Sequence, residues 1–277
     1  MQAYNFFDYK AFIDYHGEDF FGTWHKIYII FAIVAIVLLC VFLRKASRHS
    51  VEIFLKIISI VVPILEACKI VWESSYDIAL YGEFNWSGLL PLYTCSMFIY
   101  ILPIAAWTKG KVRECALAFL TTIGVFAGLT NFFVPPILNT YPFFTYATFT
   151  SLYFHTLMVF TGVFLVTTKY YVPNTKSILK AFIPLVCFSA IVIPVNFYLN
   201  KIGYYPDYML YMYGNGAPLL PTLAAFFGGM NLRLVYSLIV MLGYYLIIAL
   251  FVGIYHVINL FSLMGRKPQS DDVLINS

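Results

Sequence analysis

Two side chains with the chemistry of a nucleophile and a base lie in separate apolar stretches of the chain. Cys95 lies in LLPLYTCSMFIY, which has Pro91 where the first turn of a helix accepts a proline. His155 lies in the later stretch SLYFHTLMVF. A thiol next to an imidazole can lose its proton to that base and become a nucleophile. The two residues therefore predict a nucleophile and its base, provided that the fold brings them together.

Further polar side chains lie in the neighbouring apolar stretches. Glu66 and Lys69 are three positions apart, a spacing that places both on one face of a helix and lets them pair. Asn196 and Arg233 lie near the ends of two later stretches. Because an isolated polar group in hydrocarbon is costly, we expect these four residues to converge with the cysteine and the histidine around a cavity and to bind substrate there.

The composition identifies lipid as the main solvent of this chain. Hydrophobic residues make up 61% of its 277 residues and charged residues only 11%, whereas soluble domains carry about 25% charged residues. The formal net charge of +4 is too small to indicate a nucleic-acid partner. We therefore predict a multi-pass protein of the cell membrane whose partners are membrane lipids.

The five cysteines predict neither a disulfide framework nor a metal site. None has a CxxC or similar spacing, and all lie in apolar segments, where cysteine usually behaves as a small hydrophobic residue. The N-terminal residues are aromatic and acidic, without the basic start and apolar core of a signal peptide. No cofactor is expected.

The apolar segments predict an all-α protein, a bundle of seven transmembrane helices, because each segment is close to the length that crosses a bilayer. The bundle is expected to occupy residues 24–264, after an interfacial segment at 1–23 and before a polar cytoplasmic tail at 265–277. The predicted spans are Ile27–Leu43, Val51–Trp72, Ser87–Trp107, Cys115–Phe132, Phe149–Thr168, Lys180–Leu199 and Leu234–Leu260.

The distribution of basic residues predicts the orientation of the chain. The loops after the first, third and fifth spans, and the tail, hold most of the Lys and Arg, while the alternate loops carry acidic residues or no charge. The positive-inside rule then places the N-terminus outside and the C-terminus in the cytoplasm. At 1.5 Å per residue, Cys95 and His155 would share a depth of about 10 Å below the outer surface.

Each candidate also has a structural interpretation. A membrane cysteine can serve as a small apolar residue, and a membrane histidine can hydrogen-bond to a neighbouring helix. The Glu66–Lys69 pair could fix helix packing, Asn196 could bind carbonyls freed by Pro194, and His25 is expected at the membrane interface.

A transporter or small-molecule binder would use the polar residues along a substrate or proton path, although the sequence has no inverted repeat. A structural or receptor-like seven-helix protein would use none of these polar residues for catalysis or transport.

The short motifs follow one another in an order found in a known family. FGTWH at residues 21–25, LPLYTC at 90–95 and YFH at 153–155, together with Glu66 and Asn196, resemble the YwaF-like bacterial membrane proteins and their eukaryotic relatives, the transmembrane protein 164 family. The resemblance runs from residue 21 into the last predicted span. Tyr93 stands where the family usually has a histidine, and Gly128 is what remains of a glycine pair.

The resemblance implies a lipid acyltransferase. It implies transfer of an acyl chain onto a lysophospholipid, with an essential cysteine that corresponds to Cys95 and an essential histidine that corresponds to His155. The family is also similar in fold to membrane hydrolases of fatty acid esters, so transfer and hydrolysis both stay open. We accordingly expect an enzyme with an acyl-thioester intermediate and with the other four polar residues around its substrate.

Overall fold

The computed structural model describes residues 5–13, 21–82, 90–204, 208–209 and 232–264, and these ranges form helices and loops without any strand. The predicted all-α class is therefore confirmed for this part of the chain. The helices are α1 (Thr23–Leu43), α2 (Arg48–Tyr81), α4 (Met97–Trp107), α5 (Gly110–Phe119), α6 (Val125–Phe133), α7 (Tyr146–Thr167), α8 (Thr175–Lys201) and α10 (Leu232–Met264). Three short helical turns are η1 (Lys10–Phe12), η2 (Leu120–Gly124) and η3 (Pro136–Asn139). The tail predicted at 265–277 lies outside the described residues.

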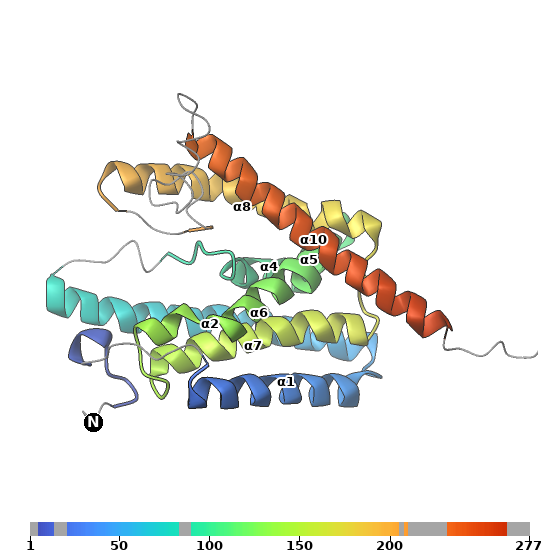
Figure 1. Ribbon diagram of the computed structural model, residues 1–277, viewed down its shortest axis with the longest axis horizontal. Helices are drawn as coiled ribbons and strands as arrows, with labels where there is room; N and C mark the ends of the chain where they lie inside the picture. Colours follow the sequence, from blue (N-terminus) through green and yellow to red (C-terminus); the bar gives the residue numbers. More distant parts are fainter. Residues whose placement is uncertain (1–4, 14–20, 83–89, 205–207, 210–231, 265–277) are drawn as a thin grey trace, which may run out of the picture.

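The helices pack side by side, with α4, α5 and α6 in the middle of the molecule (Figure 1). On one side α6 packs against α7 and α7 against α1, while α2 packs against α4. On the other side α8 packs against α5, and α10 crosses α8 obliquely. Large apolar side chains such as Phe98, Phe119 and Phe132 are fully buried between them.

Five helical segments are long and apolar enough to cross a membrane. They are α1, the continuous run Gly110–Asn139, α7, α8 and the first 28 residues of α10. These segments also turn large apolar side chains outward; Phe31 and Phe42 of α1 are 72% and 79% exposed. Exposing such an apolar surface to water is unfavourable, whereas contact with lipid chains is not. The protein is therefore embedded in a membrane.

The count of seven spans and the orientation of the chain stay predictions. α2 has 34 residues but carries Lys56, Glu66 and Lys69 within its apolar stretch. α4 has only 11 residues, a length of about 16 Å against a hydrocarbon layer of about 30 Å. The prediction of a helix over Ser87–Trp107 is wrong at residues 90–96, which form a loop and a turn before α4 begins.

Two glycines allow α7 to approach the α5–α6 run closely. A Cβ atom on Gly162 would lie 2.6 Å from the carbonyl oxygen of Leu120, and one on Gly128 would lie 2.8 Å from the carbonyl oxygen of His155. Small residues permit such approaches between membrane helices. The contact fixes the position of α7, the helix that carries His155.

Gly162→Ala is expected to lower the free energy of unfolding by about 1–3 kcal/mol, because the new methyl group overpacks a contact with a rigid backbone oxygen. Thermal unfolding of the purified protein in detergent measures the change. Gly243→Ala in α10 is the matched control, since nothing lies within 4 Å of its added Cβ. That control is expected to stabilise the helix by roughly 0.5–1 kcal/mol. Equal melting temperatures for the two variants would contradict the close packing of α7.

The described part of the predicted interfacial segment, residues 5–13, packs over the ends of α2 and α7. The Tyr9 hydroxyl donates a hydrogen bond to Asp77 at 2.5 Å, and the Tyr146 amide donates one to the Phe6 carbonyl at 2.7 Å. Burial, with the Asp77 carboxylate beside it, raises the pKa of Tyr9 well above its usual value. Among these residues the only helical element is the single turn η1, and the segment caps the two helix ends.

Candidate functional site

Cys95 lies in the turn that leads into α4, directly before the N-cap residue Ser96. The amide of Phe98 donates a hydrogen bond to the Cys95 carbonyl at 3.0 Å and so closes the turn. The cysteine is half-buried. The turn therefore places the sulfur beside the start of α4.

His155 lies in the first half of α7 and is only 6% exposed. Its Nδ1 lies 2.7 Å from the carbonyl oxygen of Ser151. A carbonyl oxygen only accepts, so Nδ1 carries the hydrogen of the neutral ring and donates it. The lone pair is then on Nε2, and no described residue hydrogen-bonds to that nitrogen. The geometry presents a buried base whose basic nitrogen is unoccupied.

The cysteine turn and the histidine helix meet through shared neighbours. The rings of Phe98 and Phe154 pack edge to face with their centroids 5.6 Å apart. The Lys69 ammonium interacts electrostatically with both the Cys95 thiol and the His155 imidazole. No hydrogen bond within the described part of the chain joins the sulfur to Nε2. The structure thus brings the two predicted residues into one buried region and leaves their reacting atoms unbonded.

Glu66 and Lys69 lie beside this region on α2. Glu66 Oε1 and Lys69 Nζ are 3.9 Å apart, so the predicted pairing on one helix face is confirmed. The pair lines a cavity of about 30 Å³ together with Thr150, Tyr153 and Phe154 of α7. Such a volume holds a water molecule but no acyl chain. An acyl chain would therefore have to enter between the helices from the lipid side.

Neither Asn196 nor Arg233 lines this cavity. Asn196 is fully buried in α8 and donates a hydrogen bond to the Tyr208 carbonyl at 3.1 Å. The Tyr208 ring packs on Tyr93, two residues before Cys95, with the ring centroids 5.1 Å apart. These contacts link Asn196 to the cysteine turn. Arg233 is half-buried in the first turn of α10 and forms no ion pair with a described acidic residue.

A tyrosine of α10 that sequence reasoning missed lies beside the cysteine. The hydroxyl groups of Tyr244 and Thr94 are hydrogen-bonded to each other, and Tyr244 interacts electrostatically with Cys95. The residue is 3% exposed. Its position near the middle of the last apolar segment was the available signal, because membrane tyrosines concentrate at the interfaces and a buried hydroxyl needs a partner.

His25, expected at the interface, is a structural tether. It is fully buried, its Nδ1 accepts a hydrogen bond from the Phe21 amide at 3.0 Å, and its Nε2 lies 2.7 Å from the Phe132 carbonyl oxygen and donates to it. Both ring nitrogens are therefore occupied. His155, by contrast, is a buried histidine with an available lone pair.

A family model described as the TMEM164 family matches residues 20–246. The match covers most of the chain and contains every site residue described above. No curated protein matches the chain, and no solved structure matches it. The family match and the apolar helices agree on a membrane protein.

Proposed function

We propose, because the chain belongs to the TMEM164 family, that it is a lipid enzyme of the cell membrane that transfers or hydrolyses acyl groups through a thioester on Cys95. His155 is the base, and phospholipid or lysophospholipid is the substrate. The observation that supports this best is the unoccupied Nε2 of a buried histidine in the same region as a thiol at a helix start. A buried polar atom without a partner is costly, and a catalytic base accounts for that cost.

In the first half-reaction, Nε2 of His155 takes the proton of the Cys95 thiol and the thiolate attacks the carbonyl carbon of a lipid ester. The tetrahedral intermediate then breaks the bond between that carbon and the alcohol oxygen. The imidazolium gives its proton to the departing oxygen, so a lysolipid leaves and the acyl thioester remains. Since the two groups are not hydrogen-bonded at rest, a movement of the Cys95 side chain or its turn belongs to this step.

In the second half-reaction, the hydroxyl of a lysolipid or a water molecule gives its proton to Nε2 of His155. The oxygen attacks the thioester carbonyl, the carbon–sulfur bond breaks, and the imidazolium returns the proton to the sulfur. Transfer and hydrolysis differ only in which hydroxyl attacks.

Lys69 and Tyr244 would stabilise charge during these steps. The Lys69 ammonium is within electrostatic range of both reacting side chains and would offset the charge of a thiolate. The Tyr244 hydroxyl, held by Thr94, would donate to the oxyanion of the tetrahedral intermediate. Glu66 would hold Lys69 in position through their ion pair.

The test uses the full chain in nanodiscs that contain phosphatidylcholine with an alkyne-tagged acyl chain. The expected result is an adduct with the mass of one acyl group, located at Cys95 and released by neutral hydroxylamine as a thioester is. An adduct at another residue, or lipid turnover without any adduct, would contradict the proposal. A protein that forms no adduct but takes up a solute into proteoliposomes would instead match the transporter hypothesis.

A further inference from the structure

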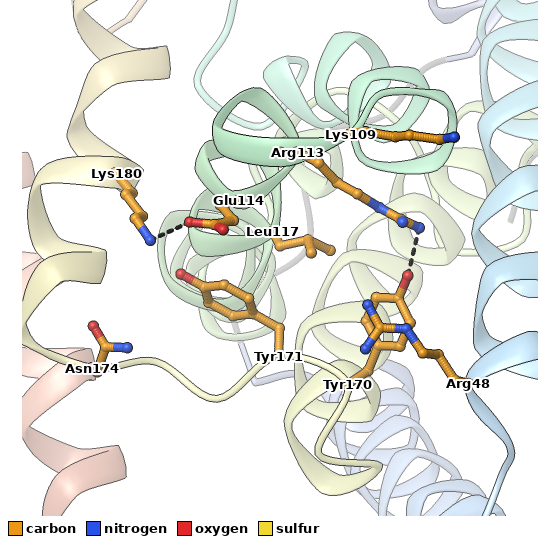
Figure 2. Close-up of a pocket in the computed structure, with 10 residues that line it drawn as sticks. Arg48, Lys109, Arg113, Glu114, Leu117, Tyr170, Tyr171, Asn174 and Lys180 are labelled. Atoms are coloured by element: carbon orange, nitrogen blue, oxygen red, sulfur yellow. Dashed lines mark hydrogen bonds and ion pairs between the residues drawn. The ribbon is translucent and has the colours of Figure 1, made fainter.

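A second and larger cavity opens among the loops that join α1 to α2, α4 to α5 and α7 to α8 (Figure 2). We refer to it as the basic-end cavity, since its lining includes Arg48, Lys109, Arg113 and Lys180. Its volume is about 390 Å³, within the range of small-molecule sites. The 11 residues of α4 separate it from the cysteine turn, a distance of about 16 Å along the helix. It is therefore distinct from the proposed acyl site.

Carboxylates at the basic-end cavity neutralise only part of its positive charge. Glu114 pairs with Lys180. Glu52 lies 3.5 Å from the Arg113 guanidinium and 3.8 Å from that of Arg48. Four cationic side chains against these two carboxylates leave two positive charges in excess. An anion would complete the charge balance.

A tyrosine orders the two arginines. The guanidinium carbons of Arg48 and Arg113 lie 5.0 Å and 5.6 Å from the centroid of the Tyr170 ring. The Tyr170 hydroxyl accepts a hydrogen bond from Arg113, as Figure 2 shows, and donates one to Glu52 at 3.2 Å. Burial raises the pKa of Tyr170, so its hydroxyl keeps the proton that this bond requires at neutral pH. Guanidinium groups held in this way lose less entropy when they bind an oxyanion.

The start of α5 adds backbone donors at the same place. Gly110 is the first residue of this helix, lines the cavity, and has a φ of 62°. The side chain of the N-cap residue, Lys109, makes no capping hydrogen bond, and Lys109 forms no ion pair with a described acidic residue. The N–H groups of a first helical turn bind phosphate readily. Side-chain cations and backbone donors thus face one volume.

From these observations we propose that the basic-end cavity binds the phosphate group of a ligand. The phosphate is carried either by an anionic lipid headgroup at the membrane surface or by a soluble phosphate compound. A phosphate has enough oxygens to accept from a guanidinium, an ammonium and backbone N–H groups at once, whereas a single carboxylate would leave some of these donors unused. The proposal does not depend on acyl chemistry at Cys95.

Binding of two probes to the full chain in detergent tests the proposal. The probes are dioctanoyl phosphatidic acid and inorganic pyrophosphate. The double variant Arg48→Gln, Lys109→Gln removes two cations from the cavity and is expected to weaken binding by about tenfold or more, since the charge-assisted hydrogen bonds of two exposed side chains are lost together. The matched control Lys45→Gln, Lys111→Gln removes the same charge from exposed positions outside the cavity, with an expected change of less than about twofold.

The binding results for the two probes either support or overturn the phosphate site. Binding of phosphatidic acid alone, weakened in the cavity variant, identifies a lipid headgroup site; binding of pyrophosphate as well, weakened in the same way, identifies a site for soluble phosphate compounds. Failure of both probes to bind the unaltered protein, or equal weakening in the control variant, overturns the proposal. Melting temperatures of both double variants confirm that they fold. Cys95→Ala is expected to bind both probes as the unaltered protein does.

Discussion

Cys95→Ala is expected to abolish the acyl adduct and to reduce lipid turnover in nanodiscs by about a thousandfold or more, because loss of a nucleophile removes the whole covalent route. The substitution removes one half-buried sulfur atom. Stability is therefore expected to change by about 1 kcal/mol or less. Intact mass of the protein and release of lysolipid from the nanodiscs measure the two effects separately.

Cys115→Ala is the matched control for this variant. Cys115 is half-buried like Cys95 but lies in α5 and has no role in the proposed mechanism, so full labelling is expected. Cys95→Ser gives a second check, since a slow adduct on its hydroxyl would be an oxygen ester that resists hydroxylamine. Lipid turnover that persists unchanged in Cys95→Ala would end the thioester mechanism.

His155→Gln is expected to slow formation of the adduct by about 10²–10⁴-fold, the usual contribution of a general base. The glutamine amide can still donate to the Ser151 carbonyl, which Nδ1 now contacts at 2.7 Å. It offers no basic nitrogen in place of Nε2. The rate of adduct formation at fixed lipid concentration, per folded protein, measures the loss.

His25→Gln separates catalysis from packing. His25 holds α1 against α6 through Nε2 and bonds the residues just before α1 through Nδ1. Its loss is therefore expected to lower the melting temperature while labelling of the folded fraction stays within about threefold. His155→Gln should show the opposite pattern. A stability loss without a rate loss in His155→Gln would assign it a structural role like that of His25.

The membrane class and the helical fold were predictable because both follow from the total amount of apolar surface. Pairing of Glu66 with Lys69 was predictable too, since helical spacing alone determines it. The start of α4 was not, because hydropathy does not distinguish an apolar turn from an apolar helix. Cys95 was therefore assigned to a helix, whereas it lies in the turn before one.

Contacts between helices were beyond the sequence prediction. A position along a helix gives the depth of a side chain, but the direction in which it faces depends on how neighbouring helices pack. Depth alone placed Asn196 and Arg233 with the other candidates, while packing directs Asn196 to Tyr208. The contact of Tyr244 could not be predicted for the same reason, since its partner Thr94 lies far away in the sequence.

The shortness of α4 has a consequence for the surrounding bilayer. A helix of 11 residues covers only about half of the hydrocarbon thickness, so one of its ends meets either a thinned membrane or a hydrated recess. Irregular backbone at such a depth persists only where protein or water surrounds it. The turn with Cys95 leads into α4, so a recess at this end would bring water and lipid headgroups towards the sulfur. Acyl-chain length and sterol content of the host membrane would then regulate access to the thiol.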